Sequence, residues 1–386
     1  MNQFLRDRKS LIARHLADVD PSATGVLFVD LSAIARNYRA IAGLCSTAEC
    51  SGVVKANAYG LGLRAVASAL ANAGCATFFV ATLAEAQSLR DQLPDARVYV
   101  LNGLLPGTAS QFRNRGLRPV LNSLVEVQEW IAESRDTGEM GYAAVQFDTG
   151  MTRLGLTPKE SATLAESTEL TEATRPTLKM SHLACADEQR HEQNSMQLKA
   201  FRDVCSRHQG TASLANSAGT MLAGDYHFDL VRPGVALYGG RAVADVPNPM
   251  SPVVHLYGRI LQIREIDATV HVGYGATHRV TGPRRLATVA AGYADGYFRH
   301  LSATHERSGA SVLVGGCKAP VVGRISMDLT VVDVSRVPAE QVVRGGWAEL
   351  IGFDMTVDDV ADCAGTIGYE VLTRLGRRYR RIYLED

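Results

Sequence analysis

The stretch Val53-Val54-Lys55-Ala56-Asn57-Ala58-Tyr59-Gly60-Leu61-Gly62 joins a short apolar run to a segment with apolar residues at helical spacing. The run predicts a buried strand, and the spacing after it predicts a helix. The same alternation repeats to about residue 240 and gives eight candidate strands: Gly52–Lys55, Thr77–Ala81, Arg97–Leu101, Arg118–Leu121, Ala143–Phe147, Leu178–His182, Ser213–Ala215 and Val231–Ala236. Helical segments between them include Leu63–Ala73, Leu83–Gln92, Leu124–Glu133 and Gln193–Arg207.

Strands separated by helix-length connections predict an α/β fold with a parallel (β/α)8 TIM-type barrel, although a doubly wound open sheet uses the same alternation. After about residue 245, β-branched runs broken by Gly, Pro and Asp predict a mostly β domain. We therefore expect a barrel over residues 30–245 and a C-terminal β domain over 246–386, with which residues 1–29 pack. The candidate strands of this domain are Val254–Arg264, Ala268–Val272, Arg285–Ala291, Ser311–Val314, Val321–Val322, Leu329–Val334 and Trp347–Gly352.

The composition favours a small-molecule partner. Forty Lys and Arg residues balance forty Asp and Glu residues, so no net field attracts nucleic acid or an anionic membrane. No apolar run approaches the roughly 20 residues that cross a bilayer. The seven cysteines form no Cys-x-x-Cys pair, which argues against a zinc site and a disulfide framework. Together with a charged N-terminal segment unlike a signal peptide, they predict a cytoplasmic protein without a bound metal.

Lys55 is the first candidate for chemistry because it ends a predicted strand. In a (β/α)8 barrel the reactive residues gather at the C-terminal ends of the strands. Apolar neighbours there would lower the pKa of the ammonium and make the amine a Schiff-base former. The alternative is a lysine that merely ends a strand and reaches solvent. The group of special residues directly after it, Tyr59-Gly60-Leu61-Gly62, favours a site.

Polar residues follow the later strands as well. His182 ends the sixth candidate strand, Asn216 and Ser217 follow the seventh, and Arg232 and Gly234 lie on the eighth. Backbone N–H groups among small residues predict a phosphate cup, since barrels often bind phosphate near the last two strands. Each residue also has a structural alternative: a core histidine, a helix N-cap or a member of a structural ion pair.

In the predicted β domain, Gly273-Tyr274-Gly275 holds a tyrosine in a tight turn. The glycines permit a positive φ or a close backbone approach, so the phenol can be presented at a site. Taken alone, a turn with a surface tyrosine is the simpler interpretation.

Together, the motifs occur in an order that is specific for one family. They are Val54-Lys55-Ala56-Asn57-Ala58-Tyr59-Gly60, Asp148-Thr149-Gly150-Met151 with Arg153-Leu154-Gly155, Ser181-His182-Leu183-Ala184, Asn216-Ser217-Ala218, Arg232-Pro233-Gly234 with Leu237-Tyr238-Gly239, Val272-Gly273-Tyr274-Gly275-Ala276-Thr277, Gly292-Tyr293-Ala294-Asp295-Gly296 and Gly323-Arg324-Ile325-Ser326-Met327-Asp328. In these motifs the chain resembles the alanine racemases, over nearly its whole length.

The resemblance implies pyridoxal 5'-phosphate as cofactor and a head-to-tail homodimer whose active sites are shared between subunits. It implies a two-base interconversion of L- and D-alanine, an isomerase reaction that serves D-alanine biosynthesis for peptidoglycan or D-alanine breakdown. Lys55 would carry the cofactor and act on the D side, and Tyr274 of the partner subunit would act on the L side. Tyrosine has an unperturbed pKa of about 10, so His182 and Arg232 would lower it by hydrogen bonding and positive charge.

The same resemblance implies roles for the remaining site residues. Arg232 would also face the pyridine nitrogen, and Arg153 and the backbone N–H of Met327 would hold the substrate carboxylate. Tyr293 would narrow the entrance to the site. The residues implied for the phosphate are Tyr59, Asn216, Ser217, Gly234 and Val235.

The sequence departs from the family pattern at two places. Many relatives carry a carbamylated lysine where this chain has Gln146, which is neutral and cannot be carbamylated. Its amide can still orient Arg153, but without a charge. A C-terminal tyrosine that touches the phosphate in some relatives aligns with Arg377, and Tyr379 follows two residues later.

Three other functions remain open at this point. A serine or broad-specificity racemase differs only in the width of its pocket, although periplasmic broad-spectrum relatives carry a signal peptide. A barrel decarboxylase of the same cofactor class is disfavoured because we find no Gly-Gly-Gly phosphate motif. A non-catalytic pyridoxal-phosphate carrier has the lysine-bearing barrel but ends after it, whereas this chain continues for about 140 residues and supplies Tyr274.

Overall fold

The computed structural model describes residues 3–45, 47–138, 141–167 and 178–385. The chain divides into two units, one formed by Ser32–Ser251 and the other by Met1–Leu31 with Pro252–Asp386. In the described residues no helix is both long and apolar enough to cross a bilayer.

Seven consecutive strands of the first unit form one parallel sheet in sequence order. An eighth strand, β10 (Leu230–Val231), pairs in parallel with β2 (Glu49–Cys50), which directly precedes β3. The Arg232 N–H donates to the carbonyl of Ala215 at 2.9 Å and so joins β10 to the end of β9. The ring of strands is closed, and the predicted (β/α)8 barrel is confirmed. The seven strands are β3 (Gly52–Val53), β4 (Thr77–Val80), β5 (Arg97–Val100), β6 (Arg118–Leu121), β7 (Ala144–Gln146), β8 (Leu178–Met180) and β9 (Thr211–Ser213).

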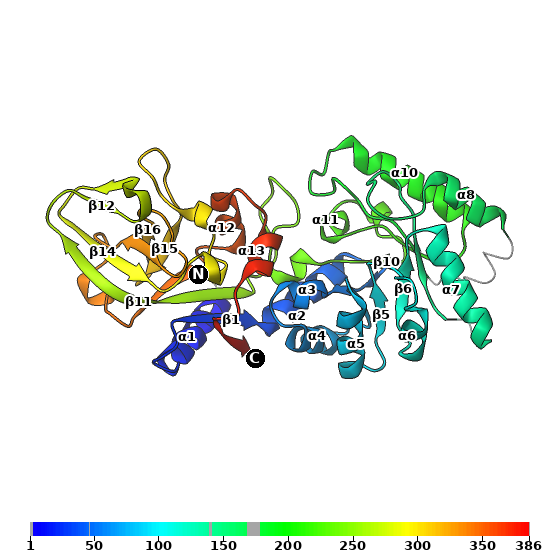
Figure 1. Cartoon of the computed structure of the whole chain (residues 1–386), viewed down its shortest axis with the longest axis horizontal. Helices are drawn as coiled ribbons and strands as arrows, with labels where there is room; N and C mark the ends of the chain where they lie inside the picture. The colour runs from blue at the N-terminus through cyan, green and yellow to red at the C-terminus, as the bar shows by residue number, and fades with distance from the viewer. Residues whose placement is uncertain (1–2, 46, 139–140, 168–177, 386) are drawn as a thin grey trace. The chain divides into compact units, whose positions relative to one another are not determined.

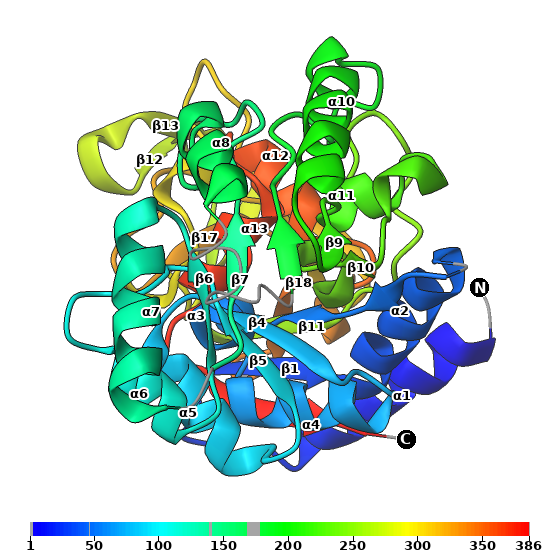
Figure 2. The same cartoon turned by 90° about the vertical axis from the view of Figure 1, so that its right-hand side faces the viewer.

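Helices surround the strands on the outside, as Figure 2 shows. Side-chain caps begin several of them: Thr82 and Glu85 form a capping box at α5, and Thr157 and Glu160 form another at α8. The strands are mostly buried because both of their faces are covered; all four residues of β4 are buried. The helices are α2 (Leu31–Leu44), α4 (Leu63–Asn72), α5 (Leu83–Gln92), α6 (Ala109–Asn114), α7 (Leu124–Thr137), α8 (Pro158–Glu166) and α10 (Glu192–Arg207).

Most of the predicted barrel strands are shorter than expected, and the strand predicted over Ser213–Ala215 lies instead at Thr211–Ser213. Two of the differences affect candidate site residues. The first predicted strand ends at Val53, so Lys55 begins a helical turn instead of ending the strand. The strand predicted over Val231–Ala236 stops at Val231 and is followed by the 3-10 helix η2 (Val235–Tyr238). Pro233 lacks an N–H and cannot donate to a ladder, although its carbonyl still accepts from the Val53 N–H at 3.0 Å.

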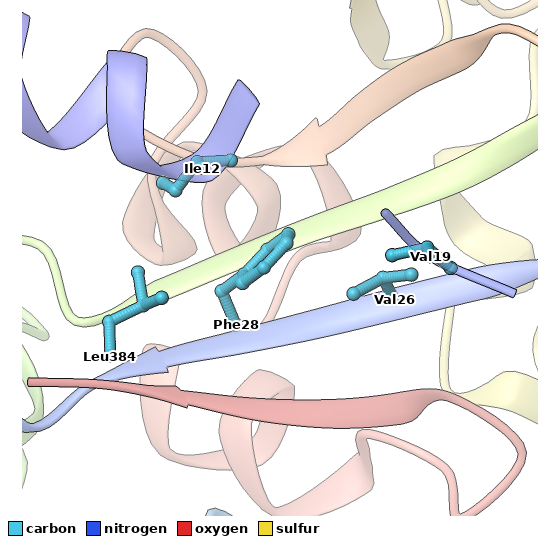
Figure 3. Packing of buried hydrophobic residues seen from close by; sticks show 5 residues of the cluster. All are labelled: Ile12, Val19, Val26, Phe28 and Leu384. Atoms are coloured by element: carbon cyan, nitrogen blue, oxygen red, sulfur yellow. The ribbon is translucent and has the colours of Figure 1, made fainter. Parts of the chain in front are cut away.

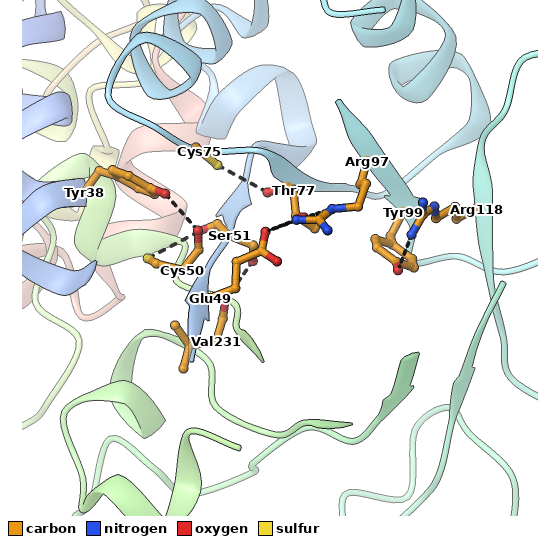
Figure 4. Close-up of polar contacts among 10 residues, drawn as sticks. All are labelled: Tyr38, Glu49, Cys50, Ser51, Cys75, Thr77, Arg97, Tyr99, Arg118 and Val231. Atoms are coloured by element: carbon orange, nitrogen blue, oxygen red, sulfur yellow. Dashed lines mark hydrogen bonds and ion pairs between the residues drawn. The ribbon is translucent and has the colours of Figure 1, made fainter. Parts of the chain in front are cut away.

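The first residues of the barrel strands are joined by polar contacts (Figure 4). Glu49 Oε1 accepts hydrogen bonds from Thr77 Oγ1 and from Arg97 Nη2, both at 2.6 Å. Arg97 Nε also donates to Thr77 Oγ1 at 2.8 Å, which links three neighbouring strands. Arg118 Nη1 extends the row by donating to the Tyr99 hydroxyl at 2.9 Å. At this end of the barrel, Arg97 has a carboxylate partner and Arg118 has a hydroxyl.

The second unit is mostly β, and its central strand β11 (Val254–Ile266) pairs antiparallel with three neighbours. The segment Val321–Val322 predicted as a strand makes only a single bridge, between Val321 and Val332. The other strands are β1 (Gly25–Asp30), β12 (Val270–Val272), β13 (His278–Val280), β14 (Arg284–Val289), β15 (Ser311–Val314), β16 (Cys317–Pro320), β17 (Thr330–Asp333), β18 (Trp347–Ile351) and β19 (Arg380–Leu384), with helices α12 (Val357–Ala364) and α13 (Gly368–Arg374).

The N-terminal segment is an integral part of this unit. Strand β1 is buried along its whole length between β11, to which it is antiparallel, and β19, to which it is parallel. Helix α1 (Gln3–Ala17) packs on the sheet through the cluster of Ile12, Val19, Val26, Phe28 and Leu384, drawn in Figure 3. This burial is what fixes the N-terminal segment to the β domain.

Candidate active site

Lys55 opens a short helix, α3 (Lys55–Tyr59), with an unusual backbone. The four residues that follow it, Ala56–Tyr59, have φ angles between 53° and 56°, in the left-handed region. This conformation costs about 1–2 kcal/mol per non-glycine residue. The Asn57 N–H donates to Glu85 Oε1 at 3.1 Å, and Asn57 Oδ1 accepts from the Leu63 N–H at 2.8 Å. Strained turns held by their surroundings in this way cluster at functional sites.

The surroundings of Lys55 favour its neutral amine. Burial lowers the pKa of the half-buried side chain, and the charge of Arg153 lowers it further, while Glu85 opposes the change. A lysine with a lowered pKa has more free amine near neutral pH, and the free amine is the nucleophile that attacks a carbonyl.

Arg232 is a buried cation whose hydrogen-bond acceptors are neutral. Its guanidinium donates to the Ser181 carbonyl, to Ser213 Oγ and to the Leu214 carbonyl. Its Nη2 lies 3.5 Å from His182 Nδ1. Burial lowers the pKa of Arg232 to about 9, so the group stays protonated at neutral pH.

His182 is held in its neutral form. Burial lowers its pKa to about 3, with further contributions from the charges of Arg232, Arg153 and Lys55. The three cations that act on His182 come from three other motifs of the sequence. A neutral histidine accepts at one ring nitrogen and donates at the other.

The residues predicted for the phosphate lie at the ends of the last two strands and contact one another. Ser217 Oγ accepts from the N–H of Gly234 at 2.8 Å and from that of Ala236 at 3.4 Å. A Cβ atom at Gly234 would overlap the hydroxyl of Tyr59, so only glycine leaves room there. Asn216 caps a short helix (Ser217–Thr220), because its Oδ1 accepts from the Gly219 N–H at 2.8 Å.

Arg153 projects from a tightly held loop after β7. Asp148 Oδ1 accepts three backbone N–H groups, from Gly150, Met151 and Thr152, at 2.9–3.0 Å. Gln146 is buried, and its amide donates to the Leu154 carbonyl at 3.1 Å, next to Arg153 in the chain. The Arg153 side chain itself is exposed. The loop thus fixes the backbone from which this cation reaches out.

The second unit carries the other three predicted residues, all with exposed side chains. Tyr274 lies between β12 and β13 and is 70% exposed. Gly273 and Gly275 on either side have positive φ, and a Cβ at either would press on Arg324. The glycines therefore serve the close approach that the motif suggested, and the turn presents the phenol to the outside.

Tyr293 and Met327 lie on two loops that contact each other. The Tyr293 N–H donates to the Ser326 carbonyl at 3.1 Å, and the Ala294 N–H donates to the Met327 carbonyl at 3.0 Å. A Cβ at Gly292 would overlap the Met327 carbonyl, which explains the glycine at the start of the Gly-Tyr-Ala-Asp-Gly motif.

Several contributors escaped the sequence argument. Ser213 and Phe79 surround the Arg232 guanidinium, which lies 5.9 Å from the Phe79 ring, and Glu85 holds the Lys55 turn. Nothing in the sequence distinguishes them from other strand and helix residues. At the C-terminus, Tyr379 is buried against Gly25 as part of the second unit, whereas Arg377 is exposed.

Comparisons with known proteins agree with this geometry. Two family descriptions match: alanine racemase, N-terminal domain, over residues 29–242, and alanine racemase, C-terminal domain, over residues 253–383. An alanine racemase of Methylobacterium nodulans is 49% identical over 93% of this chain and 96% of its own length. A catabolic alanine racemase of Agrobacterium fabrum is 45% identical over 94% and 93%. The crystal structure of alanine racemase from Bartonella henselae with covalently bound pyridoxal phosphate is 40% identical, covers 94% of this chain and 100% of that one, and superposes with a TM-score of 0.89. The chain therefore belongs to the alanine racemase family.

Proposed function

We propose that this chain is a pyridoxal-phosphate-dependent racemase that interconverts L- and D-alanine. The observation that carries the proposal is the C-terminal end of the barrel, where Lys55 has a lowered pKa and the buried Arg232 meets only neutral acceptors among the described residues. An anionic cofactor with an aldehyde suits this end, because the aldehyde needs a neutral amine and the anion needs cations and N–H donors.

The residues present fit the parts of pyridoxal phosphate. The Ser217 hydroxyl, the Tyr59 hydroxyl and the backbone N–H group of Val235 would hold the phosphate, and the Gly234 N–H would join them by exchanging its bond to Ser217 Oγ for one to the phosphate. Asn216, whose oxygen caps the following helix, keeps its amide N–H groups for the same phosphate. When bound to the substrate amine, the cofactor supplies an electron sink that makes the Cα proton acidic.

Arg232 and His182 would tune the site. A guanidinium can only donate, so Arg232 would donate to the ring nitrogen of the cofactor and leave that nitrogen unprotonated. A weaker electron sink limits side reactions such as transamination. The neutral His182 would accept or donate one hydrogen bond without adding a charge.

Inversion at Cα needs one group that removes the proton from one face and another that returns it on the opposite face. We assign the D face to Lys55 and the L face to Tyr274 of the partner subunit. The lowered pKa of Lys55 supports its role as a base, and the exposure of Tyr274 supports its contribution to another subunit. The working enzyme is then a homodimer with shared active sites.

The substrate would be held by its carboxylate. Arg153 and the backbone N–H of Met327, from the partner, supply a cation and a donor for it, and Tyr293 narrows the access for larger side chains. A small pocket of this kind suits alanine. Free cysteines throughout the chain fit an enzyme of the reducing cytoplasm, where D-alanine serves as a peptidoglycan precursor.

Exchange of the α-proton with deuterated water, followed by NMR over a panel of amino acids, tests the proposal. We expect both enantiomers of alanine to exchange and to converge on an equal mixture, with serine slower. If serine or larger amino acids exchange as fast as alanine, the enzyme is a racemase of broader specificity. If no amino acid exchanges, the chain is not a racemase.

A further inference from the structure

The loops that carry Tyr293 and Met327 are joined by a side chain that has no part in the chemistry proposed above. Arg378 Nε contacts Asp295 Oδ1 at 2.6 Å, and its Nη1 contacts Asp328 Oδ1 at 2.8 Å. Asp295 is two residues after Tyr293, and Asp328 directly follows Met327. One guanidinium therefore spans both loops.

Asp295 is the inner anchor of this arrangement. Its side chain is 9% exposed, whereas those of Arg378 and Asp328 are more than half exposed. Its second oxygen accepts from the Gly292 N–H at 3.1 Å, and its carbonyl accepts from the Gly376 N–H at 2.9 Å. Asp295 thus holds its own loop and the C-terminal segment, and Arg378 ties both to Asp328.

The Arg378 pairs with Asp295 and Asp328, here called the tie, lie next to the backbone N–H of Met327. The Met327 carbonyl is engaged by the Ala294 N–H, and among the described residues the Met327 N–H itself donates to no acceptor. The adjoining turn is closed by the Ser326 N–H, which donates to the Leu329 carbonyl at 2.9 Å. A shift of Asp328 would therefore move the Met327 N–H, whereas the hydrogen bonds on either side would resist the shift only in part.

We infer that Arg378 is a positioning residue: by pairing with Asp295 and Asp328 together, it holds the Met327 N–H in place for the substrate carboxylate and holds the loop of Tyr293 at the entrance. The inference rests on the proposed function. A planar guanidinium offers separate N–H groups to two carboxylates, whereas a lysine ammonium is a single point charge, so Arg378→Lys restores the tie only in part. Because the arginine lines a cavity of about 230 Å³ with both carboxylates and is half-exposed, salt weakens the pairs.

Two measurements on the cofactor-loaded enzyme test this. The variants are Arg378→Gln, the milder Asp328→Asn, which removes one arm, and Arg380→Gln, which removes an exposed arginine nearby as a matched control. We expect Arg378→Gln to raise KM for alanine about tenfold with kcat changed less than about threefold. Asp328→Asn and Arg378→Lys should give smaller increases, and Arg380→Gln none. High salt should raise KM of the wild type more than that of Arg378→Gln, because the pairing of the substrate carboxylate with Arg153 is screened in both proteins and the Arg378 pairs exist only in the wild type.

Amide hydrogen exchange at residues 292–296 and 323–329 measures how firmly Arg378 holds the two loops, independently of activity. We expect exchange about tenfold faster there in Arg378→Gln than in Arg380→Gln. Unchanged exchange overturns the tie whatever the kinetics show. Faster exchange with KM within twofold of wild type overturns the positioning role and leaves a structural ion pair. If the wild type exchanges the α-proton of no amino acid, the proposed function fails. Amide hydrogen exchange still shows whether Arg378 holds the two loops together.

Discussion

The two ends of the barrel strands differ in the hydrogen-bond partners of their arginines. At the N-terminal end, Arg97 lies 2.6 Å from the carboxylate of Glu49, and the same carboxylate accepts from Thr77 (Figure 4). At the C-terminal end, Arg232 is more deeply buried, and every hydrogen-bond acceptor around it is a carbonyl, a hydroxyl or a neutral imidazole.

Two carboxylates at the C-terminal end, Glu85 and Asp148, accept backbone N–H groups, and neither is a hydrogen-bond partner of Arg232, although the charge of Glu85 partly offsets that around Lys55. Glu85 holds the Asn57 and Ala81 N–H groups, and Asp148 holds three more. A buried cation without a counter-charge costs stability. The comparison indicates that the Glu49–Arg97 pair stabilises the N-terminal end, whereas the buried Arg232 at the C-terminal end suits the anionic ligand proposed above.

The largest effect that this comparison predicts is at Lys55. Lys55→Ala should abolish racemisation, by at least about 10⁴-fold, because it removes both the cofactor attachment and one base. The absorbance band of the covalently bound cofactor should vanish with it. Lys199→Ala, at an exposed position on α10, is the control and should behave as wild type. A Lys55→Ala enzyme with more than a few per cent of activity would contradict the assignment.

Tyr274→Phe should come next, with a loss of about 10²–10⁴-fold. The cofactor band should remain, and deprotonation of L-alanine should suffer more than that of D-alanine, as measured by exchange from each enantiomer. Tyr142→Phe, at another exposed tyrosine, should have no effect. Equal losses in the two directions would argue against a base that serves one face.

The lowered pKa of His182, at the C-terminal end of the barrel, predicts that the stability of the fold depends on pH. The pKa of His182 is lowered to about 3 from an ordinary value near 6.5, so below pH 6.5 the unfolded chain takes up a proton that the folded one does not. The free energy of unfolding should therefore fall as pH drops from about 6.5 towards 3, by at most about 1.4 kcal/mol per unit for this group. Urea unfolding at several pH values should show a smaller slope in His182→Asn. His255, whose pKa burial also lowers to about 3, accounts for part of the remaining slope. An unchanged slope in His182→Asn would show that the cations around this residue do not destabilise its charged form.

At the opposite end, Glu49→Gln should lower the free energy of unfolding by about 0.5–1 kcal/mol, a small value because solvent screens this part-exposed pair. kcat and KM should not change. The double variant with Arg97→Gln measures the coupling between the two side chains. A loss of activity in Glu49→Gln would contradict the conclusion that Glu49 contributes to stability and not to catalysis.

The smallest expected effect is that of bicarbonate. Because Gln146 cannot form a carbamate and donates to the Leu154 carbonyl, added bicarbonate should leave the activity of the wild type unchanged. Gln146→Lys supplies the comparison, since only lysine can be carbamylated. Stimulation of the wild type that disappears in a Gln146 variant would refute this.

Much of the fold follows from local pattern. The strand Arg118–Leu121 and the helix Leu83–Gln92 have the bounds that their apolar spacing predicts. This is possible because the spacing of apolar residues along the chain indicates which faces of an element are buried. The strand Gly25–Asp30 escaped prediction. Its partners are β11 and β19, more than 200 residues further along the chain, and local spacing does not report such pairs.

The sequence by itself determined the alternation that makes a barrel, the change to a β domain and the motifs that carry Lys55, His182, Arg232 and Tyr274. Only the tertiary structure decided which charges meet. It showed that Arg232 donates to neutral acceptors, that Asn216 caps a helix and that Arg378 contacts carboxylates on two loops. The physical reason is that periodicity records which face of an element is buried, whereas hydrogen bonds and pKa shifts depend on side chains that the fold brings together from distant segments.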